Sequence, residues 1–185
     1  MMKNLFQILC GLFLVVSYSS CMHSEEYKVD VFIIGGGASG VTSGIQSARM
    51  GANTLILEES TWLGGMLTSA GVSAVDGNYR LPAGLWGEFK NRLSDYYGGL
   101  DSLKTGWVSN VLFEPSVGNK ILHEMVAAEN NLKVWKQACL EEVKRTGDEW
   151  VAKVKVEGQG VKTVRAKVMI DATELGDVAK MCDVR

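Results

Sequence analysis

The chain has 185 residues, a formal net charge of −2 and 46% hydrophobic residues. This composition is typical of a globular protein and excludes a disordered one. The near-neutral charge gives no electrostatic footprint for nucleic acid, so no nucleic-acid partner is expected.

The first twenty residues predict a signal peptide of the lipoprotein type. A short basic start precedes an apolar run over residues 5–16, which is too short to span a bilayer. Small residues then lead to Cys21, which we expect to carry lipid, and residues 21–27 would form a tether. The protein would then be exported and anchored in the bacterial cell envelope by this lipid alone, on the periplasmic side or in the outer membrane. The alternative is an ordinary secretory peptide that is cut near Ser19 or Ser20.

A glycine motif follows the first predicted strand of the domain. The apolar, β-branched run over 29–34 ends in Gly-x-Gly-x-x-Gly at Gly35, Gly37 and Gly40. Gly35 permits the tight turn out of the strand, and Gly37 lets the backbone approach a pyrophosphate. Gly40 lets the following helix lie close on the sheet, and the phosphates would lie at the N-terminus of that helix.

An amphipathic helix and a second strand continue the pattern of a dinucleotide-binding unit. Apolar residues recur at helical spacing over 41–48, and a buried strand is predicted over 54–57. Glu58 closes this strand 23 residues after Gly35, near the position of an acid that binds the adenosine ribose. No Lys or Arg directly follows Glu58, which favours FAD or NAD over NADP. The alternative is a glycine-rich turn between any strand and helix.

Two more helices and a third strand are predicted beyond the glycine pair at 64 and 65. The helices cover 82–97 and 115–128, and each has an apolar stripe that is typical of a core-facing surface. The short run over 132–135 predicts a strand that extends the parallel sheet.

The last third of the chain predicts a β-meander. Its alternating runs cover 140–143, 150–156 and 161–164, with turns between them. The chain then returns to a separate buried strand over 168–170. A polar segment, 171–177, follows that strand.

The cysteines and histidines predict neither a metal site nor a catalytic acid–base pair. Cys10 would leave with the signal peptide and Cys21 would carry lipid, which leaves Cys139 and Cys182. No C-x-x-C spacing exists, so neither iron–sulfur nor zinc ligation is expected. A disulfide between the two is allowed in an oxidising compartment, although separate buried thiols are favoured. His123 in the middle of a predicted helix is typical of a solvated or packed histidine.

These motifs resemble the bacterial FAD-dependent oxidoreductases of the glutathione-reductase-like superfamily. The resemblance rests on the strand with its glycine motif, on Leu-Gly-Gly-Met at 63–66 and on Asp-Ala-Thr-x-x-Gly-Asp at 171–177. It implies an α/β domain of the FAD/NAD(P)-binding type over 28–185, with a Rossmann-like parallel sheet, helices and an inserted β-meander. It also implies a flavoprotein that uses bound FAD to oxidise or reduce a small molecule whose identity stays unknown.

By position, the resemblance assigns the three motif glycines to the FAD pyrophosphate and Glu58 to the adenosine ribose. It assigns Gly64, Gly65 and Thr173 to segments that close over the phosphates and the ribityl side. The complete set of expected cofactor-binding residues is Gly35, Gly37, Ala38, Ser39, Gly40, Glu58, Glu59, Gly64, Gly65, Met66 and Thr173.

Relatives of this kind continue for several hundred residues after the Asp-Ala-Thr strand. The chain is therefore similar to the N-terminal portion of a longer enzyme, with the domain incomplete at its C-terminus. Two other functions stay open at this point: a non-catalytic nucleotide-binding fragment of such an enzyme, and an NAD-dependent dehydrogenase.

Overall fold

The computed structural model describes residues 26–107 and 109–184, and the predicted signal peptide and Cys21 lie outside these ranges. The first strand begins at Glu26, two residues before the predicted start of the domain. In chain order the elements are β1 (Glu26–Ile34), α2 (Ala38–Arg49), β2 (Thr54–Leu57), η1 (Gly65–Leu67), α3 (Gly84–Tyr97), η2 (Leu100–Leu103), α4 (Pro115–Ala127), β3 (Leu132–Trp135), β4 (Ala138–Thr146), β5 (Glu149–Val156), β6 (Gly160–Asp171) and α5 (Asp177–Met181).

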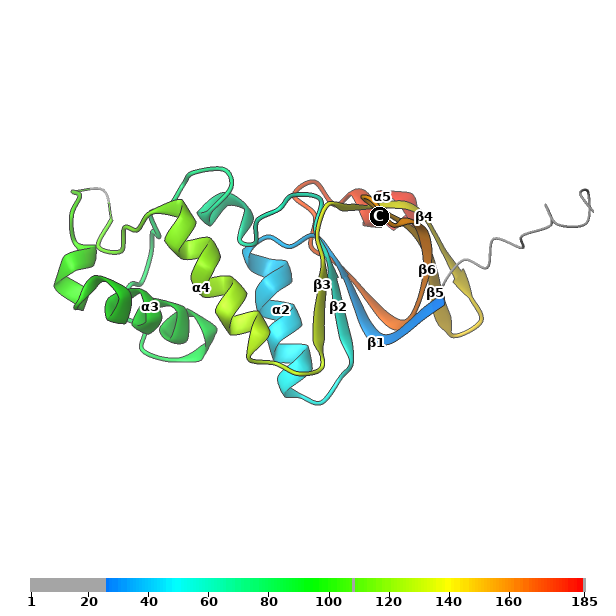
Figure 1. The fold of residues 1–185 in the computed structure, drawn as a ribbon, viewed down its shortest axis with the longest axis horizontal. Helices are drawn as coiled ribbons and strands as arrows, with labels where there is room; N and C mark the ends of the chain where they lie inside the picture. Colours follow the sequence, from blue (N-terminus) through cyan, green and yellow to red (C-terminus); the bar gives the residue numbers. More distant parts are fainter. Residues whose placement is uncertain (1–25, 108, 185) are drawn as a thin grey trace, which may run out of the picture.

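The strands form one six-stranded sheet in the order β3-β2-β1-β6-β5-β4. The β1, β2, β3 and β6 strands pair in parallel, whereas β4, β5 and β6 form an antiparallel meander. Figure 1 shows that the sheet curves and that α2, α4 and α3 lie on the side of the parallel strands away from the meander. The predicted α/β class, with a Rossmann-like parallel sheet and a β-meander, is confirmed.

The β6 strand corrects one prediction. The sequence predicts a meander strand over 161–164 and a separate strand over 168–170, but the structure has one continuous strand. The intervening residues keep the two-residue alternation of a strand, because Ala166 is buried while Arg165 and Lys167 form ion pairs with acidic residues of β1. The strand pairs with β5 along its first half and with β1 as far as Asp171. The meander and the parallel sheet therefore share β6.

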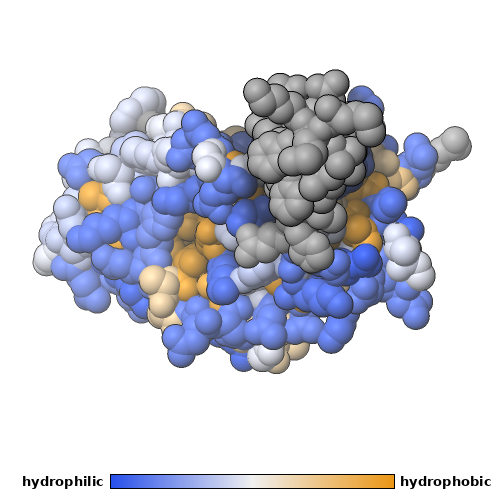
Figure 2. Space-filling view, turned by 45° about the vertical axis from the view of Figure 1, so that its right-hand side comes forward, coloured by the Kyte–Doolittle hydropathy of each residue, from blue (hydrophilic) through white to orange (hydrophobic). Residues whose placement is uncertain are grey.

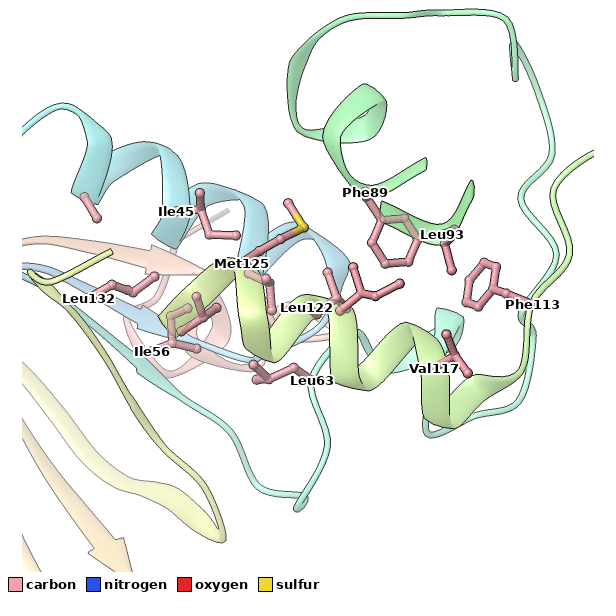
Figure 3. Packing of buried hydrophobic residues seen from close by; sticks show 14 of the residues in the cluster. Ile45, Ile56, Leu63, Phe89, Leu93, Phe113, Val117, Leu122, Met125 and Leu132 are labelled. Carbon is pink, nitrogen blue, oxygen red and sulfur yellow. The ribbon is translucent and has the colours of Figure 1, made fainter. Parts of the chain in front are cut away.

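One hydrophobic core lies between the parallel strands and the helices (Figure 3). Its fully buried side chains include Ile33 from β1, Ile45 from α2 and Met125 from α4. Burial of each side chain of this size contributes about 1.5–3 kcal/mol. Tyr96 does not belong to this core, since it is 52% exposed. Tyr97, which follows the buried Leu93 at a spacing of four residues, packs against the core instead.

A second core lies between the parallel strands and the meander. Phe32 and Ile34 of β1 pack there with Val154 of β5 and Val164 of β6. The central strands β1 and β2 are therefore buried on both faces, and their carboxyl ends are fixed from both sides. This double support positions the loops that leave those ends.

On the face drawn in Figure 2, outside the grey atoms, hydrophobic residues form small separate patches within a hydrophilic surface. Individual apolar side chains are nevertheless exposed, such as Trp107 at 98% and Leu175 at 85%. Within the described residues, no helix has both the length and the apolar character that crossing a bilayer would need.

Candidate functional site

A pocket of about 460 Å³ lies beyond the carboxyl ends of β1, β2 and β6. On one side of β1 lies β2, which is the next strand along the chain. On the other side lies β6, which is the last strand of the chain. This is the topological switch point at which open α/β sheets bind ligands. The lining residues are Ile34, Gly35, Gly37, Leu57, Glu58, Glu59, Gly65, Met66, Ser69, Ala70, Ala138, Ala172, Thr173, Glu174, Leu175 and Asp177.

Two of the three motif glycines, Gly35 and Gly37, line the pocket, whereas Gly40 does not. The surroundings of the three glycines differ. Gly35 has φ +103°, and a Cβ there would lie 2.4 Å from the carbonyl oxygen of Ala172. A Cβ at Gly40 would lie 1.8 Å from the carbonyl oxygen of Gly35, so α2 packs directly against the turn. Around Gly37 the space is open, since a Cβ there would meet only Glu174 Oε1, at 3.6 Å. The bare backbone of Gly37 therefore faces the pocket.

The N-terminus of α2 points its free backbone donors toward this region. Gly37 is the N-cap residue, no side chain caps the helix, and its first turn contains no acidic residue. Ala38 and Ser39 form this first turn beside the pocket, but they are not part of its wall. A helix N-terminus of this kind favours an anion such as a phosphate.

Glu58 joins the end of β2 to the glycine loop. Its Oε2 accepts a 2.7 Å hydrogen bond from Gly36 N, and its Oε1 accepts a 2.7 Å hydrogen bond from Ser60 N. Two backbone donors thus fix the carboxylate while it lines the pocket. Each oxygen keeps a further lone pair for a ligand hydroxyl. Glu59 also lines the pocket, but its side chain is exposed.

The segment around η1 forms a second wall over the glycine loop. Gly64 N donates a 2.8 Å hydrogen bond to Gly36 O, and Gly64 forms an isolated parallel bridge with Gly37. Gly64 lies behind this wall, whereas Gly65 and Met66 line the pocket. Met66 is 58% exposed. The structure therefore brings the Leu-Gly-Gly-Met segment onto the glycine loop.

The third wall is the loop after β6, and Asp171 holds it. Its Oδ1 accepts hydrogen bonds from Thr173 N (3.0 Å) and Thr173 Oγ1 (2.7 Å), and its Oδ2 accepts one from Ala179 N (2.8 Å). The Thr173 hydroxyl in turn accepts a hydrogen bond from Asp177 N. Burial raises the pKa of Asp171, but hydrogen bonds from Thr173, Ala179 and Val178 outweigh burial and leave the pKa below its ordinary value.

Sequence reasoning missed several residues of the wall. Ser69, Ala70, Ala138 and Leu175 line the pocket, but small or apolar residues such as these carry no chemical signature in a sequence. The motif over 171–177 contains Asp177, and its carboxyl group was a signal that could have added this residue to the expected set.

The remaining candidate residues lie outside the pocket wall. His123 is half-buried on α4, where burial and, to a lesser degree, Lys136 lower its pKa, which favours the neutral imidazole. Cys139 and Cys182 are separate free thiols, each half-buried. No group of three or more His, Cys, Asp or Glu side chains suited to a metal ion occurs in the described part of the chain.

A second hollow adjoins the pocket next to Glu59 and Ala138, which belong to both. It has a volume of about 500 Å³, and it is also lined by Gln137 and Glu157. Gln137 has φ +51° and donates a side-chain hydrogen bond to Glu157. The two hollows together form an elongated site that starts at the glycine loop and runs past the end of β2.

Comparisons with known proteins found one matching family and several matching folds. The sequence model of the FAD dependent oxidoreductase family matches residues 30–185. No curated protein matches the chain by sequence.

Several solved structures share the fold at low sequence identity. A flavoprotein/dehydrogenase from Cytophaga hutchinsonii has a TM-score of 0.61 and 17% identity, over 83% of this chain and 41% of that protein. OxyS anhydrotetracycline hydroxylase from Streptomyces rimosus has a TM-score of 0.59 and 13% identity, over 83% of this chain and 33% of that one. Bacillithiol disulfide reductase from Bacillus cereus has a TM-score of 0.52 and 17% identity, over 79% of this chain and 40% of that protein. The chain thus spans well under half of each of these proteins.

Proposed function

The chain belongs to the FAD dependent oxidoreductase family, and from this premise we propose that its pocket holds the ADP half of FAD. FAD is the cofactor of this family. The observation that carries the proposal is the cradle at Gly37. There, backbone without a side chain, the uncapped N-terminus of α2 and an open pocket meet at one point. This combination suits a pyrophosphate.

Each wall would bind a different part of the cofactor. Gly37, with the first-turn amides of Ala38 and Ser39, would hold the pyrophosphate. Glu58, which two backbone donors orient, would accept hydrogen bonds from the ribose hydroxyls. The neighbouring hollow beside Ala138 has room for the adenine ring. The loops at Gly65 and Thr173 would enclose the ribityl side.

The chemistry would be electron transfer, since a bound flavin exchanges electron pairs with a small-molecule substrate. The residues of this chain would bind and orient the cofactor, and the fixed Glu58 and Asp171 networks would keep its position constant. The chain covers well under half of the similar solved proteins. We therefore propose the oxidoreductase activity together with the cofactor.

A titration of the purified protein with FAD tests the proposal. We expect saturable quenching of flavin fluorescence, with ADP as a competitor and NAD as a weaker one. Binding of NAD without binding of FAD would instead indicate a nicotinamide-dependent dehydrogenase. After chemical reduction, bound flavin should pass electrons to an artificial dye. Bound flavin that exchanges no electrons would identify a non-catalytic nucleotide-binding fragment.

We further propose that the protein is exported and anchored to a membrane of the bacterial cell envelope through lipid on Cys21. The support comes from the sequence: a short apolar run over 5–16, small residues before the cysteine and a polar stretch after it. Mass spectrometry of the mature N-terminus tests this proposal directly, because a diacylated Cys21 would be the first residue.

A further inference from the structure

The side chain of Glu174 lies over the glycine cradle. Its Oε1 is 3.6 Å from the position of a Cβ at Gly37 and 3.3 Å from that of a Cβ at Gly65. Both positions lack side chains, so the carboxylate faces bare backbone from two walls of the pocket. Among the described residues, Glu174 forms no ion pair, and its side chain is exposed. Within the described part of the chain, no basic side chain therefore neutralises its charge.

The charged side chains that line the pocket are all acidic. The residues that line the pocket include four carboxylates, at Glu58, Glu59, Glu174 and Asp177, and they include no Lys, Arg or His. The N-terminus of α2 is the positive group that the pocket offers to a phosphate. A ligand diphosphate placed at Gly37 would thus enter a site in which the nearest charged side chain is Glu174.

We propose that Glu174 opposes charged ligands at the phosphate cradle, so that a diphosphate at Gly37 and Gly65 binds against the negative charge of its carboxylate. This inference rests on the proposed function, because it assumes that the ligand phosphates lie at Gly37. In this arrangement Glu174 lowers the affinity for charged ligands and leaves the affinity for uncharged ones unchanged. The carboxylate thereby makes the affinity of the site depend on ligand charge and on ionic strength.

The size of the effect follows from Coulomb's law. A carboxylate within about 5 Å of a diphosphate costs enough free energy, even at nearly the dielectric constant of water, to weaken binding about tenfold. Because the side chain is exposed, salt screens this repulsion, with a Debye length of about 10 Å at 0.1 M and about 3 Å at 1 M. The penalty should therefore be large at low salt and small at high salt.

Titrations of Glu174→Gln and Glu174→Ala with ADP, FAD and adenosine test the proposal. We expect both variants to bind ADP and FAD about tenfold more tightly than the parent at low salt, with a gain of about twofold or less in 1 M salt. Adenosine, which has no phosphate, should bind all three proteins equally. Asp95→Asn is the matched control, because it removes one exposed carboxylate from α3, which contributes no residue to the pocket. Its dissociation constants should equal those of the parent.

These titrations distinguish a failure of the inference about Glu174 from a failure of the proposed FAD binding. Equal affinity of the parent and Glu174→Gln for ADP would overturn the inference and leave FAD binding intact. A gain in Glu174→Ala alone would also overturn it, since volume rather than charge would then matter. Weaker binding by Glu174→Gln would show that the carboxylate is a ligand contact instead. If neither ADP nor FAD bound any of the proteins, the proposed function would fail, and the inference with it.

Discussion

The substitution Gly37→Ala should separate ligand binding from folding stability. Gly37 has φ −63° and ψ −177°, which an alanine adopts without strain, and the new Cβ would meet only Glu174 Oε1 at 3.6 Å. Alanine reduces the conformational freedom of the unfolded chain, which stabilises by about 0.4–1 kcal/mol, but it is a poorer N-cap than glycine by a similar amount. The free energy of unfolding should therefore change by no more than about 0.5 kcal/mol.

Binding should respond quite differently. The added methyl group occupies the surface at which the pyrophosphate approaches, and overpacking a filled site by one methyl costs about 1–3 kcal/mol. The dissociation constant for FAD should rise about 5- to 150-fold. Urea unfolding of the ligand-free protein and a fluorescence titration with FAD measure the two quantities.

Gly40→Ala is the matched control for this experiment. Its Cβ would lie 1.8 Å from the carbonyl oxygen of Gly35, so α2 would have to move away from the turn. We expect a loss of stability of about 1–3 kcal/mol or more. The reasoning is refuted if Gly37→Ala binds FAD as tightly as the parent, or if it is destabilised as much as Gly40→Ala.

Three further predictions follow from the carboxylates and from Cys21. Glu58→Ala should weaken FAD binding by about 1–3 kcal/mol through the loss of a charged acceptor, and an unchanged dissociation constant would remove Glu58 from the site. The pKa of Asp171 is lowered in the folded state, so its contribution to stability is present above about pH 4 and is lost as the pH falls through the lower folded-state value. Asp171→Asn should accordingly lower the free energy of unfolding at pH 7, and a difference from the parent that persists undiminished in urea titrations far below pH 4 would contradict this assignment. Cys21→Ser should release the protein from the membrane fraction, whereas Cys139→Ser should leave it there. If both variants stayed in the membrane fraction, that result would argue against lipid on Cys21.

The parts of the site that local sequence patterns determine were predictable. The motif glycines and Glu58 are identified by spacing, since a strand, a tight turn and a helix N-terminus follow one another within a few residues. Gly35 and Gly40 have the close contacts that the motif requires. In contrast, Ala138 reaches the pocket only because the first residue of β4 lies beside the end of β2. Its position depends on tertiary structure that no local pattern encodes.

The β6 strand illustrates the same limit in the fold. Arg165 and Lys167 make the middle of this strand look like a polar break between two apolar runs. Their partners, Glu26 and Asp30, lie more than a hundred residues earlier in the chain. Continuity of the strand thus depends on pairing with β1, and a single sequence gives no direct sign of that pairing.

The position of β1 between β2 and β6 has a consequence for the order in which the chain can fold. β1 carries the apolar run over 31–34, and its neighbour on one side, β2, follows within twenty-five residues. Its other neighbour is β6, and in this pairing Glu26 lies opposite Thr163, which is 137 residues later in the chain. Contacts of such separation form slowly. During synthesis, one edge of the central strand therefore stays unpaired until nearly all of the described chain has emerged. That edge is where a nascent molecule would be most prone to join another, and where a chaperone would have most to protect.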